Sequence, residues 1–62
     1  MRKFRYSVDG GPSAEHECMG KYDVINELFP DFSKDLAARE APNGGADFLL
    51  SDGRVVEVRS ID

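Results

Sequence analysis

The segment from residue 46 to residue 58 constrains the fold more than any other part of the sequence. Two runs of alternating apolar and polar residues flank the turn Ser51-Asp52-Gly53, a pattern typical of an antiparallel β-hairpin. A two-residue turn would set Phe48 opposite Glu57 and place the aromatic ring beside a charge. A three-residue loop with its glycine in the left-handed conformation instead pairs Phe48 with Val56. We predict this second register, which collects one apolar face: Ala46, Phe48, Val56 and Val58.

The N-terminal segment shows the same period of two. Phe4, Tyr6 and Val8 alternate with polar residues and predict a strand with one buried face. The run Asp9-Gly10-Gly11-Pro12 then turns the chain, because glycine tolerates positive φ and proline cannot continue a ladder. Residues 14–19 fit either a short return strand or the start of a helix, and we favour the strand.

The middle of the chain predicts two short helices. Over residues 21–29 the apolar side chains fall within one arc at the helical period, and Pro30 ends the segment. Ser33 is a suitable N-cap for a second helix through Ala41, which the run Pro42-Asn43-Gly44-Gly45 then stops.

These elements predict an α+β fold in the order ββααββ. A small antiparallel sheet would pack against the two short helices, in one domain over residues 1–62. A chain of this length buries a single small core, so we expect a net stability of only a few kcal/mol. The core candidates are Phe4, Tyr6, Val8, Val24, Ile25, Leu28, Phe29, Leu36, Phe48, Val56 and Val58.

Composition indicates the kind of compartment in which the protein acts. Cys18 is the only cysteine, so an internal disulfide is excluded and a reducing compartment fits best. The basic start of the chain lacks the apolar run of a signal peptide, and no segment approaches the ~20 apolar residues of a membrane span. We therefore expect a cytoplasmic monomer without a membrane contact and without a cofactor.

Charge is unevenly distributed along the chain. Ten of the twelve carboxylates lie between Asp9 and Asp52, where there are only three basic residues, and the two ends are basic. The formal net charge is −4. Net negative charge argues against direct binding to a phosphate backbone and favours a basic partner.

The most suggestive spacing is a carboxylate at every fourth position: Asp23, Glu27, Asp31 and Asp35. Residues four apart share a helix face, and like charges there cost a few tenths of a kcal/mol, so stability alone does not explain them. Such a row resembles in spacing the phosphates of a nucleic-acid strand, at about half their density. We expect Glu15 and Glu17 to flank this partner-binding row. The plainer interpretation is a solvated acidic helix face.

No constellation of residues predicts an enzyme or a metal site. His16 and Cys18 stand on one side of the predicted strand and suggest a thiolate–imidazole pair, but nothing orients the base or forms an oxyanion hole. The plainer interpretation is a half-buried cysteine beside an edge histidine. Two such ligands are too few for zinc. We predict a protein that is not an enzyme and binds no metal.

Two further surfaces remain as alternatives. Lys3, Arg5 and Arg59 form a basic face of the sheet, but Tyr6 alternates to its other side, so the stacking platform of a single-strand binder does not assemble. Leu49 and Val55 share the face opposite the predicted core. If exposed, they make a patch for a protein partner, as in a small adaptor, or a dimer seam.

With its acidic row and no catalytic motif, the chain resembles the small phage-encoded anti-CRISPR inhibitors. The likeness covers the whole chain of 62 residues but carries no family motif, and the modest net charge and basic strands depart from it. The resemblance implies a compact inhibitor without catalytic residues, acting in the bacterial host cytoplasm. Its partner would be a basic nucleic-acid-binding protein such as a CRISPR effector complex, which it blocks as a DNA mimic through Asp23, Glu27, Asp31, Asp35, Glu15 and Glu17.

Overall fold

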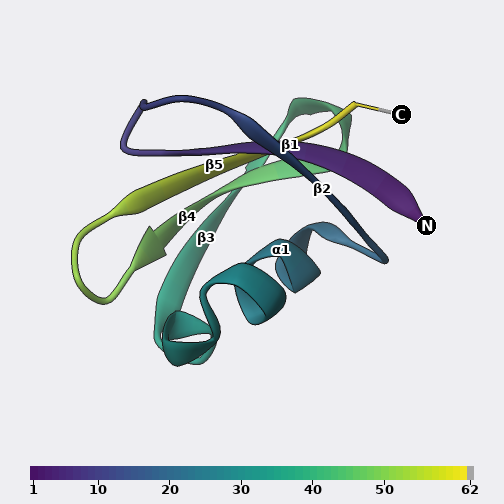
Figure 1. Ribbon diagram of the computed structural model, residues 1–62. Helices are drawn as coiled ribbons and strands as arrows, with labels where there is room; N and C mark the ends of the chain where they lie inside the picture. Colours follow the sequence, from purple (N-terminus) through teal and green to yellow (C-terminus); the bar gives the residue numbers. More distant parts are fainter. Residues whose placement is uncertain (62) are drawn as a thin grey trace.

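Five antiparallel strands and one α-helix make up the computed structural model, which describes residues 1–61 (Figure 1). The strands form a single sheet in the order β2-β1-β5-β4-β3, and the helix lies against one of its faces. The elements along the chain are β1 (Arg2–Val8), β2 (Ala14–Cys18), α1 (Lys21–Leu28), the 3₁₀ turn η1 (Pro30–Phe32), β3 (Leu36–Ala41), the 3₁₀ turn η2 (Pro42–Gly44), β4 (Gly45–Leu50) and β5 (Val55–Ser60).

The predicted order ββααββ with two helices is wrong. The segment expected to form a second helix, residues 33–41, instead supplies strand β3, which pairs along its whole length with β4. Ser33 is not the N-cap of a helix: it follows the 3₁₀ turn η1, and its hydroxyl donates to the carbonyl of Pro30 at 3.1 Å. The fold is therefore a five-stranded antiparallel sheet with one helix.

Partnership with β4 explains why residues 36–41 are extended. Their alanines favour a helix in isolation, but a helix of about nine residues is marginal in water. As a strand, the segment sets Leu36 beside Leu50 and Ala38 beside Phe48, on the side that the helix covers. It also supplies hydrogen-bond partners to β4, whose main chain would otherwise form an unpaired edge beside the core.

Both predicted hairpins are present. The β4–β5 pair has the predicted register, with Phe48 opposite Val56 and Ala46 opposite Val58, around a three-residue turn in which Gly53 has φ +94°. The β1–β2 pair confirms that residues 14–18 are a strand. Its turn uses left-handed backbone at Asp9 (φ 51°) and Gly10 (φ 73°).

Helix α1 forms where it was predicted. The main-chain N–H of Gly20, which precedes the helix, donates to Asp23 Oδ2 at 3.0 Å, so a carboxylate of the first turn closes the N-terminus. At the other end the Phe29 N–H still bonds to the Ile25 carbonyl at 2.8 Å, and Pro30 then begins η1. The helix buries only Val24 and Ile25 completely.

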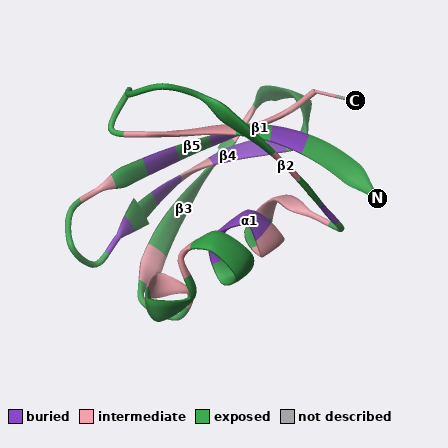
Figure 2. Ribbon diagram, in the orientation of Figure 1, coloured by how far each residue is buried: buried purple, intermediate pink, exposed green. Residues whose placement is uncertain are grey.

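The core lies between α1 and one face of the sheet, where Figure 2 shows buried residues on β1, β4, β5 and the helix. Six of the predicted core residues are fully buried, and Leu28 is exposed. Three buried residues were not among the core candidates: Cys18, Leu50 and Ala46, the last of which was predicted to lie on the apolar face of the hairpin. The rings of Tyr22 and Phe48 meet edge to face, with centroids 5.3 Å apart, at the margin of this core.

Strand alternation divides the sheet into two faces. The covered face carries the buried side chains and packs against α1. The other face, which we call the open face, carries the alternate residues of each strand. Its members are Lys3, Arg5, Ser7, Glu15, Glu17, Ala37, Arg39, Ala41, Gly45, Asp47, Leu49, Val55, Glu57 and Arg59.

Candidate functional site

The predicted acidic row does not form one helical stripe. Asp23 and Glu27 share α1, Asp31 lies in η1, and Asp35 lies in the bend that leads into β3. No second helix continues the spacing beyond Pro30, so the expected ladder of four carboxylates on a shallowly bent helix pair is absent from the described residues.

Two of these carboxylates have partners inside the molecule. Asp23 is half-buried and accepts the hydrogen bond from the Gly20 main chain described above. Glu27 Oε1 lies 2.7 Å from His16 Nε2, which ties the helix to edge strand β2. Both residues therefore have structural roles: Asp23 caps the N-terminus of α1, and Glu27 joins the helix to strand β2.

Glu15 and Glu17, predicted to flank the acidic row, lie on the opposite side of the protein. They belong to the open face, where Glu15 stands opposite Arg5 and Glu17 opposite Lys3 in the β1–β2 register. Opposite charges in directly facing positions stabilise a strand pair. The six predicted contact residues therefore occupy two different surfaces.

The open face is balanced in charge. It holds four carboxylates and four basic groups. Opposite charges face each other throughout the β1–β2 pair and at Arg39 and Asp47, whereas like charges face each other at Arg5 and Arg59 and at Asp47 and Glu57. Among the described residues, Arg59 Nη1 and Asp47 Oδ1 form a direct ion pair at 2.8 Å. Because the open face contributes no net charge, the formal −4 of the chain belongs to its other residues. The charged groups of the open face are Lys3, Arg5, Glu15, Glu17, Arg39, Asp47, Glu57 and Arg59.

Part of the unbalanced acid lies on the helix side. Glu27 and Asp31 are exposed there, and Asp35 is exposed in the bend that leads into β3. Of the cations nearby, Lys21 is already paired with Glu40, whereas Lys34 is exposed. Two of the predicted anionic residues, Glu27 on α1 and Asp31 in η1, thus remain exposed on the helix side.

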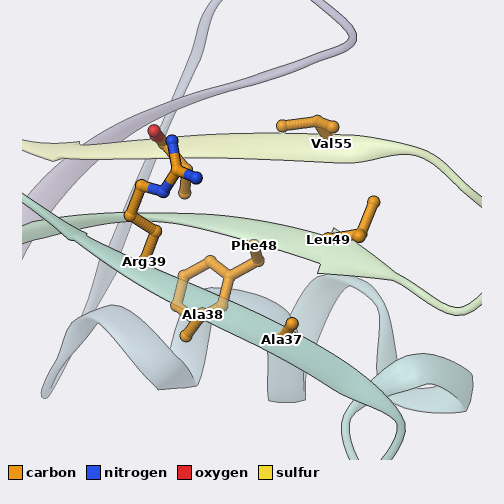
Figure 3. A pocket seen from close by; sticks show the side chains of 7 residues that line it. Ala37, Ala38, Arg39, Phe48, Leu49 and Val55 are labelled. Atoms are coloured by element: carbon orange, nitrogen blue, oxygen red, sulfur yellow. The ribbon is translucent and has the colours of Figure 1, made fainter.

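An apolar row crosses the end of the open face. Ala37, Leu49 and Val55 stand opposite one another on β3, β4 and β5, as Figure 3 shows. Leu49 is 49% exposed and Val55 37% exposed, which places the pair at the surface. The row lines an open hollow of about 410 Å³, with Arg39 and Asp47 at its polar end.

A second cluster, missed by sequence reasoning, joins the β4–β5 turn to η1. The guanidinium carbon of Arg54 lies 5.5 Å from the ring centroid of Phe29 and 5.2 Å from that of Phe32. Its Nε donates to Asp52 Oδ2 at 2.6 Å. The Arg54 main-chain N–H, and then its guanidinium, hold the pKa of Asp52 below its ordinary value. The cluster fixes the end of the helix layer against the sheet.

His16 and Cys18 do not form a catalytic pair. The Cys18 thiol is buried and donates to the Gly20 carbonyl at 3.3 Å, whereas His16 bonds to Glu27. Burial raises the pKa of the Cys18 thiol, and the nearby charges of Glu27 and Asp23 raise it further. A protonated, enclosed thiol is a poor nucleophile, so the geometry supports the structural interpretation of this cysteine.

Two other kinds of site can be assessed for residues 1–61. No three histidine, cysteine or carboxylate side chains in this range gather closely enough to hold a metal ion. None of the helices formed by the described residues combines the length and the apolar composition needed to cross a bilayer.

No protein-family model matches the chain, and comparison with curated proteins and with solved structures gave no match.

Proposed function

We propose that the protein is a non-enzymatic inhibitor that docks its acidic helix side on a cationic surface of a nucleic-acid-handling protein. The charge balance of the open face carries this proposal. Because the sheet contributes no net charge, the excess of acid lies outside the strands, and part of it is on the helix side, where Glu27 and Asp31 are exposed. A cationic groove would meet those groups much as it meets phosphates.

The contact differs from the one expected from the sequence. Asp23 adds to the negative electrostatic potential of the helix side but makes no direct contact with the partner, because its carboxylate accepts a hydrogen bond from the Gly20 main chain. Glu15 and Glu17 play no part, since they stand on the open face opposite Lys3 and Arg5. Exposed Glu27 and Asp31 are the central anionic contacts. The resemblance to anti-CRISPR inhibitors would make the partner a CRISPR effector surface that accepts target DNA.

Two double variants test the proposal because they change net charge equally on opposite sides. E27Q/D31N removes two charges from the helix side, and E15Q/E17Q removes two from the open face. Each exposed ion pair contributes about 0.2–1 kcal/mol, so the first variant should bind about 2–30-fold more weakly at low salt. The second should bind like the wild-type protein. Binding is followed with a partner captured from a bacterial lysate on the wild-type chain.

Salt and competing DNA complete the test. Binding through the helix side should weaken as ionic strength rises, and duplex DNA should displace the protein from its partner. Equal loss of binding in both double variants would mean that only overall charge matters. Retention by both would contradict the proposal.

The exposed apolar row favours a second candidate function, that of a small adaptor which binds a protein through the open face. Leu49 and Val55 lie side by side in an open hollow rather than under a helix. Binding through this row would be nearly indifferent to salt, since burial of apolar surface dominates it. L49S would then abolish capture of the partner while E27Q/D31N left it unchanged.

A further inference from the structure

Strand β3 ends the sheet with unpaired main-chain groups. The N–H of Leu50 donates to the Arg54 carbonyl at 2.9 Å, and the Leu50 carbonyl accepts from the Gly53 N–H at 3.0 Å, so both groups of Leu50 face β5. Main-chain groups alternate in direction along a strand, so those of Leu49 face β3, where they meet Ala37. The same alternation turns the N–H and C=O groups of Leu36, Ala38 and Glu40 away from the sheet.

The two edges of the sheet differ in protection. Edge strand β2 carries two like charges, Glu15 and Glu17, which discourage pairing with a second copy of that strand. Edge strand β3 carries one charge of each sign, three alanines and no bulge, and it pairs without interruption along its inner side. A proline lies near each strand, Pro12 before β2 and Pro42 directly after β3. Its residues 37–40 are exposed, as the largely green β3 in Figure 2 shows. An edge of this kind is competent to accept another strand.

We infer that β3 pairs antiparallel with β3 of a second copy of this chain, about a two-fold axis at Ala37. The evidence is the charge pattern of residues 34–40, Lys-Asp-Leu-Ala-Ala-Arg-Glu, which is complementary to its own reverse. A contact about a two-fold axis requires such self-complementarity, because the same strand forms both sides of the contact and each pair of facing residues occurs twice. Lys34 and Asp35 lie in the bend that precedes β3, which begins at Leu36. When the pairing continues through that bend in the same register, Asp35 faces Arg39 of the second copy, and Lys34 faces its Glu40.

Symmetry limits the possible registers, and charge disfavours those centred on Ala38 and Arg39. A two-fold axis perpendicular to the sheet joins residues of the same face, so it must pass through a residue rather than between two. Centred on Arg39, the pairing sets that arginine against itself. Centred on Ala38, it sets Leu36 against Glu40 and unites no opposite charges. Like charges or unmatched polar groups in facing positions are unfavourable, so the Ala37 register is the best of the three.

The main-chain geometry agrees with the Ala37 register. Leu36 and Ala38 both turn their N–H and C=O groups outward, so Leu36 of each copy exchanges hydrogen bonds with Ala38 of the other. The two copies of Ala37 then form a non-hydrogen-bonded pair, in which Cα atoms approach to about 4.5 Å. A small side chain suits the axis at that separation.

The side chains that are free to pair also fit. Neither Arg39 nor Asp35 takes part in an ion pair or side-chain hydrogen bond within residues 1–61. Glu40 contacts Lys21 but is 76% exposed, which leaves its second oxygen accessible to Lys34 of the other copy. The Asp35–Arg39 contact, made twice, is therefore the main charge contact of the seam.

The seam also extends the apolar row. Ala37, Leu49 and Val55 of one copy would continue directly into Ala37, Leu49 and Val55 of the other across the open face. The two hollows would join beside the axis. One strand pair buries less area than a standard interface, so the dimer should be weak and concentration-dependent. Neither Glu27 nor Asp31 lies in the seam, so this inference does not rest on the proposed function, and it departs from the monomer expected from the sequence.

Sedimentation velocity tests the inference over about 10 µM to 1 mM, a range that spans the affinities of small transient interfaces. The wild-type chain should shift from monomer to dimer within that range. R39D sets Asp35 against an aspartate twice and should weaken association about tenfold or more. The charge-swapped variant D35R/R39D restores both attractions and should return association to within about threefold of wild type.

Substitution at the axis adds a matched comparison. A37K places two ammonium groups beside each other at the two-fold axis and should abolish the dimer, whereas A14K, the same change on exposed Ala14 of the other edge strand, should leave it unchanged. Circular dichroism verifies that each variant folds. A wild-type chain that stays monomeric to about 1 mM overturns the inference. So does a dimer that resists both R39D and A37K, or one that D35R/R39D does not restore.

Discussion

The two faces of the sheet are built from the same strands and differ completely in character. On β4, Phe48 is 0% exposed beneath α1, whereas its neighbour Leu49 is 49% exposed on the open face. The covered face holds the apolar core, and the open face carries charges of both signs in equal number, with one apolar row at its end. Neighbours in the sequence thus belong to surfaces with different roles.

The comparison shows how the topology redistributes charge. Along the chain, acid lies in the middle and base at the two ends. In space, the basic strands β1 and β5 run side by side between β2 and β4, which carry Glu15, Glu17 and Asp47. The segregation seen in the sequence is therefore cancelled on the open face, and among the described residues it survives on the helix side and in the strand turns that hold Asp9 and Asp52.

The largest expected contrast is between the two neighbours on β4. Phe48→Ala removes a fully buried ring and should cost about 3–5 kcal/mol, enough to unfold a domain of this size at 25 °C. Leu49→Ala removes half-exposed surface and should cost less than about 1 kcal/mol. Urea denaturation followed by circular dichroism measures both. A cost for Leu49→Ala close to that for Phe48→Ala would mean that the apolar row is covered in solution.

A smaller effect is expected at Gly45, which begins β4 on the open face. A Cβ added there would lie 2.4 Å from the Val58 carbonyl oxygen, so the main chain of β5 must shift. Gly45→Ala should therefore cost about 1–3 kcal/mol by overpacking. The matched control is Gly20→Ala, because a Cβ at Gly20 meets its nearest neighbour, the Asp23 side chain, at 3.9 Å. Equal costs for the two alanines, measured by thermal unfolding, would contradict the close packing at Gly45.

Local patterns predicted much of the fold correctly. The alternation of residues 4–8, the ambiguous return strand, helix α1 and the β4–β5 register all depend on neighbours in the sequence or on one tight turn. The prediction of a helix over residues 33–41 was wrong, because the alanine-rich sequence of this segment favours a helix only in isolation. Its extended form depends on β4, which follows it in the chain, and propensity contains no information about that partner.

The candidate site was less predictable than the fold. Alternation with buried Cys18 already implied that Glu15 and Glu17 face away from the core, so their separation from the helix could have been foreseen. The bond between His16 and Glu27 could not, because it depends on how α1 lies across β2. The Arg54 cluster also joins residues from two distant segments, and no spacing in the sequence indicates it.

The smallest expected effect concerns the charge lattice of the open face. Arg59 and Asp47 form its one direct ion pair among the described residues, and both are partly exposed, so their coupling should be about 0.2–1 kcal/mol in a double-mutant cycle. Asp47 also stands between Arg39, which attracts it, and Glu57, which repels it, in the strand register. The cycle of Asp47→Asn and Arg59→Gln is measured by urea denaturation at low and at high salt. Exposed pairs are screened, so the coupling should shrink at high salt. A coupling that stays above 1 kcal/mol in both conditions would mean that this face is shielded from solvent, as a partner or a second copy laid over it would make it.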